Sequence, residues 1–279
     1  MTRKNIFDVL GQSMDIAYEI CKLNTLCNKN MVIESTLFHY RLEEFIDKYC
    51  LRYWKNRNRC ISCKEIRERL NISDFDIKNK LREEQVFYYL EYLANLIWIC
   101  DDFVDTDPNY EITQEYIFLC ENLSDIVDSL NCELKTFEDE EKVLVVEKSK
   151  SVTAVAEIVE PELAYDIVYY NHHSLRGNVT EKRRILKILS DKIEPIRAEF
   201  KKLQIHKELE SNVGFLLNKM NIRHNNIEGK NAITYVQNLS DKNLEEWYDE
   251  TYQLILLCIL EYDNLERNKR IVELKKEIN

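Results

Sequence analysis

Two dense groups of polar residues in the second half of the chain could act on a phosphodiester bond. They occupy residues 171–176 and 218–226, and each closes a predicted helix. A histidine can take or give the proton of a ribose hydroxyl while an arginine stabilises the charge that develops on phosphorus, so we expect no metal ion and no cofactor. The residues concerned are His172, His173 and Arg176 in the first group and Asn218, Lys219, Asn221, Arg223, His224, Asn225 and Asn226 in the second.

The same residues could instead have a purely structural role, in which their side chains bond backbone groups at the ends of helices. Polar side chains at helix ends commonly cap the helix and turn the chain, and Asn225, Asn226 and Gly229 are typical loop formers. Composition by itself favours this structural interpretation of both groups.

Glycine and proline are scarce in this chain, which has 279 residues but only 4 Gly and 3 Pro. The glycines, at positions 11, 177, 214 and 229, are too far apart to form a dinucleotide fingerprint, a Walker-type phosphate loop or a nucleophile elbow. A chain so poor in turn residues also lacks the many tight turns of a sandwich or barrel. The composition therefore predicts a mainly α protein.

The charge is unevenly distributed. The whole chain carries a net charge of −11, which argues against a general nucleic-acid or anionic-membrane binder. However, residues 101–170 carry −15 and residues 171–240 carry +6, so one basic segment lies inside an acidic protein. Both polar groups belong to that basic segment.

The cysteines and the apolar runs indicate a cytoplasmic protein that does not enter a membrane. Nine cysteines are scattered over predicted helix faces and form no disulfide framework. The longest apolar run, 254–260, is far shorter than the roughly 18 residues that a membrane-spanning helix needs. The first residues do not resemble a signal peptide.

The apolar spacing predicts helices in both halves of the chain, with a change of pattern between them. Two β-branched runs, 143–146 and 152–155, predict a small β-hairpin, and we expect an N-terminal helical domain over 1–135 and a second domain over 136–279. Pro195 should kink or split the helix that contains it. The predicted helices cover 6–23, 35–54, 64–70, a segment ending near 100, 112–130, 161–173, 180–203, 207–220 and 243–274.

Several motifs in the second half resemble abortive-infection proteins of the AbiJ type. The C-terminal part of those proteins is assigned to the HEPN superfamily of four-helix bundles, and the resemblance covers about residues 140–279. The resemblance is based on a predicted hairpin and four motifs that follow it in a fixed order along the chain. The motifs are YYNHHSLRGN (169–178), EKRRIL (181–186), LLNKMNIRHNN (216–226) and EWYDETY (246–252).

The resemblance implies a phage-defence or toxin-type RNA endonuclease that is independent of metal and uses the RNA 2′-hydroxyl as nucleophile. His224 would be the acid/base and Arg223 the phosphate ligand, in a homodimer that an antitoxin or sensor partner could control. One feature departs from the family: the usual motif separates its Arg and His by four to six residues, whereas these two are adjacent. The alternative is therefore a non-catalytic HEPN-like module that binds RNA or a protein.

An acidic motif, Asp101, Asp102 and Asp105, offers a remote alternative. It follows an aromatic helix and looks like the magnesium motif of isoprenoid synthases, in which carboxylates hold Mg²⁺ ions that bridge a diphosphate. No second metal motif accompanies it, and a solvated acidic helix end explains it as well.

Two weaker signals lie between residues 52 and 85. Cys60 and Cys63 form a single CxxC pair, whereas a zinc site needs four ligands. The stretch 61–73 has the apolar spacing of the first helix of a helix-turn-helix, but residues 75–85 offer no convincing recognition helix. The basic residues before it could equally hold an RNA backbone.

Overall fold

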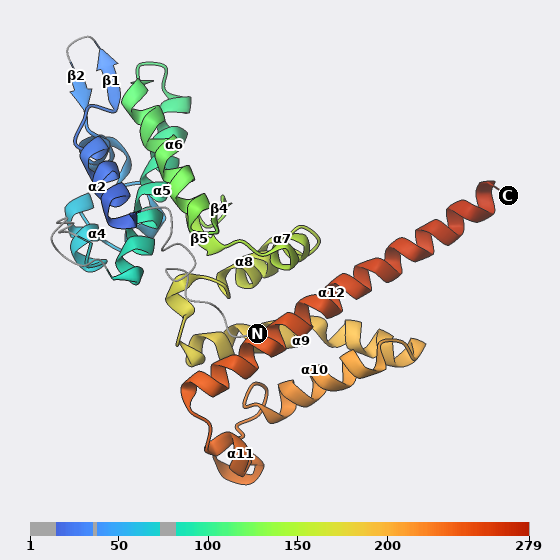
Figure 1. The fold of residues 1–279 in the computed structure, drawn as a ribbon. Coiled ribbons are helices and arrows are strands. Elements are labelled where there is room, and N and C mark those ends of the chain that lie inside the picture. The colour runs from blue at the N-terminus through green and yellow to red at the C-terminus, as the bar shows by residue number, and fades with distance from the viewer. Residues whose placement is uncertain (1–14, 36–37, 73–81, 279) are drawn as a thin grey trace. The chain divides into compact units, whose positions relative to one another are not determined.

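The computed structural model describes residues 15–35, 38–72 and 82–278 (Figure 1). The protein is mainly helical, as the shortage of glycine and proline predicted. The chain divides into two compact units, Met1–Lys148 and Ser149–Asn279. Two predictions lie partly outside the described residues. They are the start of the helix predicted over 6–23 and, in the helix-turn-helix interpretation, residues 73–81.

The first unit is built around the long helix α5 (Glu83–Thr106). Its apolar residues form a continuous buried face that includes Leu90, Leu93 and Leu96. A three-stranded antiparallel sheet has the order β2-β1-β3, and β4 and β5 form an antiparallel hairpin. The remaining elements are α2 (Ile16–Cys27), β1 (Val32–Ser35), β2 (Phe38–Tyr40), α3 (Leu42–Phe45), a π-helix (Ile46–Cys50), a 3₁₀ turn (Lys55–Arg57), α4 (Cys63–Arg69), β3 (Glu111–Ile112), α6 (Gln114–Ser129), β4 (Cys132–Phe137) and β5 (Lys142–Glu147).

The hairpin differs from the prediction in its strands and in the unit to which it belongs. Strand β5 contains the predicted run 143–146, but 152–155 lies in helix α7 (Lys150–Ala156), where the Ser149 side chain caps the N-terminus by accepting from the Val152 N–H. The predicted second strand is therefore wrong, and β4 takes its place.

Polar contacts to α5 hold the hairpin in the first unit. The Asn95 side chain bonds both backbone groups of Val143, at 3.0 and 2.7 Å, and the Glu91 carboxylate accepts from the Val145 N–H at 3.0 Å. The units therefore divide after Lys148, whereas the predicted domains divide after residue 135.

The second unit is a set of helices in which α9 (Val179–Leu203), α10 (Lys207–Lys219) and α12 (Asp241–Ile278) pack side by side (Figure 1). Helix α8 packs on α9, and α7 packs on α12. Helix α9 continues through Pro195 as one helix. The other elements are α8 (Pro161–Tyr169), two 3₁₀ turns (His173–Leu175 and Gly229–Asn231) and α11 (Thr234–Gln237).

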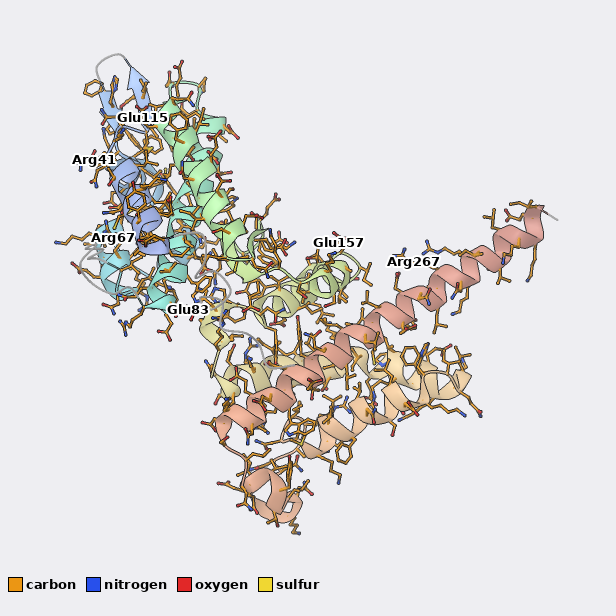
Figure 2. All side chains as sticks on the ribbon, viewed as in Figure 1. Arg41, Arg67, Glu83, Glu115, Glu157 and Arg267 are labelled. Carbon is orange, nitrogen blue, oxygen red and sulfur yellow. The ribbon has the colours of Figure 1, made fainter. Side chains whose placement is uncertain are left out.

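Helix α12 changes character along its length. Tyr248, Tyr252 and Ile255 are buried in the core of the second unit, whereas every residue from 267 to 278 is exposed. Arg267 is the first residue of that exposed part (Figure 2), and it pairs with Asp263 one turn earlier on the same helix. Among the helices within the described residues, none combines the length and the apolar character needed to cross a bilayer.

Candidate functional site

The loop after α10 is shaped by its asparagines. The Asn221 N–H donates to the Asn226 side-chain oxygen at 2.9 Å, and the Asn226 N–H donates to the Asn221 side-chain oxygen at 3.1 Å. Both residues are buried, and Asn221 adopts a left-handed conformation with φ of 58°, which asparagine tolerates better than most residues. The Asn225 side chain accepts from the N–H groups of Ile227 and Glu228. These three asparagines therefore have the structural role of loop formers.

Arg223 fixes this loop to α9. Its guanidinium donates to the Ser190 hydroxyl at 3.1 Å and to the Ser190 carbonyl at 2.9 Å, and it forms an ion pair with Glu194. The ion pair lowers the pKa of Glu194, chiefly through the hydrogen bond from Arg223. A phosphate group would therefore have to compete with a carboxylate for this guanidinium.

His224, the next residue, is exposed. Lys219 is exposed at the end of α10, and Asn218 is half-buried beside it. His224 and Lys219 can therefore meet a ligand from solvent, unlike the buried asparagines of the same loop.

The first polar group is buried, apart from Arg176. His172 caps the 3₁₀ turn His173–Leu175: its Nδ1 lies 2.7 Å from the Ser174 hydroxyl and accepts from the Ser174 N–H at 3.3 Å. Burial, with smaller effects from the charges of His172 and Arg176, lowers the pKa of His173 to about 2. A histidine with that pKa is neutral near pH 7 and cannot act as the general acid there.

One side of α9 carries two basic residues and then the two residues on which Arg223 docks. Residues 183, 187, 190 and 194 follow one another at spacings of three and four, so they share one side of the helix. Ser190 and Glu194 are the partners of Arg223, and Arg183 and Lys187 precede them along the same side. Lys187 is exposed and Arg183 half-buried, and within the described residues neither has a carboxylate at ion-pair distance. We call Arg183, Lys187, Arg223 and His224 the α9 surface.

The second unit contains a buried lysine, Lys182, that was not predicted from the sequence. Lys182, on α9, is 1% exposed and pairs with two carboxylates of α12, Glu245 at 2.6 Å and Asp249 at 2.8 Å. The Tyr170 hydroxyl donates to Asp249 at 3.1 Å. The signal was present in the sequence, because Lys182 is in phase with the apolar stripe that contains Ile185 and continues along α9.

A second buried network joins α9 to α10. Arg197, 4% exposed, donates to Glu210 at 2.7 Å and to Glu194 at 3.0 Å. Gly214 makes this possible, because a Cβ at that position would lie 2.2 Å from the Arg197 Nη2 atom. Glu194 therefore has two arginine partners, Arg197 in the core and Arg223 on the loop.

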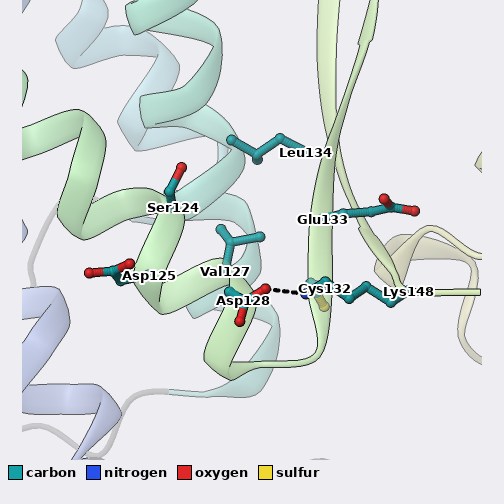
Figure 3. Close-up of a pocket in the computed structure, with 8 residues that line it drawn as sticks. All are labelled: Ser124, Asp125, Val127, Asp128, Cys132, Glu133, Leu134 and Lys148. Carbon is teal, nitrogen blue, oxygen red and sulfur yellow. Dashed lines mark hydrogen bonds and ion pairs between the residues drawn. The ribbon is translucent and has the colours of Figure 1, made fainter.

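The acidic motif of the first unit is not arranged as a diphosphate site. Asp101, Asp102 and Asp105 are exposed at the end of α5, and Asp101 accepts a hydrogen bond of 2.7 Å from the Tyr116 hydroxyl. A hollow of about 360 Å³ does lie between α6 and the β4–β5 hairpin, where Asp128 pairs with Lys148 (Figure 3). The three aspartates are not among its lining residues, which are Ser124, Asp125, Val127, Asp128, Cys132, Glu133, Leu134 and Lys148.

The CxxC pair is not part of a metal centre in the described parts of the chain. Cys60 and Cys63 are buried free thiols, and no group of three potential metal ligands there includes either of them. Burial raises the pKa of Cys63, which disfavours the thiolate that zinc needs.

No protein-family model, curated protein sequence or solved structure matches this chain. The resemblance to AbiJ-type and HEPN proteins therefore depends on its sequence motifs alone.

Proposed function

We propose that the chain is a non-catalytic RNA-binding module of the HEPN kind from a phage-defence system, and that it binds RNA through the α9 surface. The observation that carries this proposal is the docking of Arg223 on Ser190 and Glu194. That docking attaches the loop that carries the exposed His224 to the side of α9 that carries Arg183 and Lys187. Cationic side chains that line one strip of surface suit an RNA backbone, whose charge dominates affinity.

Binding is favoured over cleavage because three of the residues that could do the chemistry, Arg223, His172 and His173, are paired or buried. Arg223 is paired with a carboxylate, the Nδ1 of His172 caps a turn, and His173 is neutral near pH 7. One observation favours the alternative of a ribonuclease: the ring of His224 is exposed directly beside Arg223. A bound RNA phosphate could in that case take the place of the Glu194 carboxylate.

RNA binding is tested by fluorescence anisotropy with a labelled single-stranded RNA. Lys187→Glu should weaken binding several-fold and reduce its salt dependence, because one phosphate contact is lost. Lys192→Glu is the matched control, since Lys192 is an exposed lysine on the opposite side of the same helix. Equal weakening by both variants, or no binding by the unaltered chain, would contradict the proposal.

Cleavage is tested on the same RNA in the presence of EDTA. We expect intact RNA. Cutting that continues in EDTA and is abolished by His224→Ala would instead establish the ribonuclease. His224 is exposed, so its replacement should leave the melting temperature unchanged. Light scattering tests the homodimer that the resemblance implies, whose mass is twice the 33.5 kDa of one chain.

A further inference from the structure

Residues 51–64 of the first unit, a loop and the first two residues of α4, carry an unusual concentration of positive charge for this acidic chain. This segment contains five basic side chains and no acidic one. Two of the five are neutralised: Lys55 pairs with Glu141 at 2.6 Å, and Lys64 lies 3.8 Å from Glu68. The other three are Arg52, Arg57 and Arg59.

Two of these arginines remain available to a ligand. Arg52 and Arg59 are exposed, and among the described residues neither has a carboxylate at ion-pair distance. Arg57 is half-buried, and its guanidinium donates to the Cys60 carbonyl at 3.0 Å. The free positive charge of the loop therefore lies at Arg52 and Arg59.

An exposed aromatic ring lies next to one of these charges. Tyr53 is 67% exposed, and the Arg52 guanidinium lies 4.6 Å from its ring centroid. Ile61, 83% exposed, adds an apolar side chain to the same loop. An exposed ring beside a guanidinium can stack on a nucleic-acid base while the cation attracts the phosphate.

The loop is anchored at several points. Trp54 and Cys60 are buried, and the Trp54 indole donates to the Glu141 carbonyl at 3.1 Å. The Arg69 guanidinium donates to the Asn58 carbonyl at 2.8 Å. These contacts hold the exposed side chains on a fixed base, which lowers the entropy lost on binding.

The backbone of the loop is also held in an uncommon conformation. Asn58 and Arg59 are consecutive left-handed residues, with φ of 49° and 64°. This conformation is disfavoured for arginine, and residues kept in it cluster at functional sites. Arg59 is exposed in this turn.

We infer that Arg52, Tyr53 and Arg59 form a binding surface for single-stranded nucleic acid on the first unit. Tyr53 stacks on an unpaired base, and the two arginines contact backbone phosphates of the same strand. A duplex keeps its bases stacked on one another, so it offers Tyr53 no free base face. The inference goes beyond the proposed function and does not depend on the α9 surface.

The test is an anisotropy titration of the full chain with a labelled oligouridine of about twelve nucleotides, a length within the usual site sizes of single-strand binders. Tyr53→Ala should weaken binding about tenfold, whereas Tyr53→Phe should retain it. The plot of log affinity against log salt concentration has a negative slope, and Arg59→Ala should make it shallower by about 0.7. This is the contribution that one phosphate contact makes to the slope for a single strand. A duplex of the same length should bind more weakly than the single strand.

Tyr18→Ala is the matched control. Tyr18 is also an exposed tyrosine of the first unit with a cation near its ring, since the Lys22 Nζ atom lies 5.8 Å from the centroid. That cation is neutralised by Glu19 at 2.6 Å, so Tyr18→Ala should leave binding unchanged. Equal effects of Tyr53→Ala and Tyr18→Ala, or duplex binding as tight as that of the single strand, would overturn the inference.

The same titration separates this surface from the α9 surface. Binding that Tyr53→Ala weakens and Lys187→Glu leaves unchanged supports this inference and contradicts the proposed function. The reverse pattern overturns this inference and supports the proposed function. All these replacements are at exposed positions, so unchanged melting temperatures show that the fold is intact.

Discussion

Arg223 forms an ion pair with Glu194, and through it the loop after α10 is fixed to the middle of α9. The same guanidinium also bonds the hydroxyl and the carbonyl of Ser190. An arginine that the sequence offered as a phosphate ligand is thus part of the scaffold that positions its exposed neighbour, His224. This relationship makes the contribution of the pair to stability dependent on pH.

We expect the stabilisation that Glu194 gains from its two arginine partners, Arg223 and Arg197, to be lost in acid. The hydrogen bond from Arg223 and the charges of both arginines lower the pKa of Glu194 below its ordinary value of 4.5, so their contribution is complete above pH 4.5 and disappears as pH falls through the lowered pKa. The melting temperature of Glu194→Gln should therefore lie below that of the unaltered chain near neutral pH and approach it in acid. Glu208→Gln, at an exposed position of α10, is the control. A gap that stays constant with pH would contradict the assignment.

Gly214→Ala should destabilise the protein, although alanine normally stabilises a helix by about 1 kcal/mol relative to glycine. The new Cβ would lie 2.2 Å from the Arg197 Nη2 atom, and Arg197 is held in the core by Glu210 and Glu194. Overpacking of this kind costs about 1–3 kcal/mol. Urea unfolding measures the loss, with Ser211→Ala on an exposed position of α10 as the control. An increase in the free energy of unfolding would show that Arg197 can move aside.

Lys182→Met should cost about 3–5 kcal/mol of unfolding free energy, because it leaves two carboxylates without their buried partner. Those carboxylates belong to Glu245 and Asp249, at 2.6 and 2.8 Å from the ammonium. Arg184→Met is the comparison: Arg184 is an exposed neighbour that pairs with Glu181 at 2.7 Å, and its loss should cost less than about 1 kcal/mol. If calorimetry gave similar losses for both variants, the buried network would not be a major source of stability.

Asn226→Ala should destabilise the loop by about 1–3 kcal/mol, since it leaves the buried Asn221 N–H without its acceptor. His224→Ala, two residues earlier and exposed, should change the free energy of unfolding by less than about 0.5 kcal/mol. Chemical denaturation of the two variants under the same conditions checks the contrast. Equal effects would mean that the asparagine pair does not hold the loop.

Local patterns in the sequence were sufficient for the mainly α class. Few glycines and prolines and apolar residues at helical spacing favour helices within each segment, whatever the rest of the chain does. The helices predicted over 180–203, 207–220 and 243–274 were confirmed as α9, α10 and α12 for this reason. The loop-forming interpretation of Asn225 and Asn226 was confirmed too, because an asparagine side chain bonds backbone groups only a few residues away.

Only the tertiary structure decided which partners the distant residues meet. The run 152–155 has β-branched residues, yet it is helical, whereas β4 forms a strand because it pairs with β5 next to α5. Strand pairing depends on contacts that local propensity does not contain.

The same holds for the charged residues. Arg223 and Lys182 both belong to the basic segment 171–240, but one docks on Glu194 and the other is enclosed between Glu245 and Asp249. These carboxylates lie 29, 63 and 67 positions away in the chain. The sequence by itself determined that this segment is basic and helical. Burial and charge pairing, which arise only when the helices pack, decided which of its cations remain free to meet a ligand.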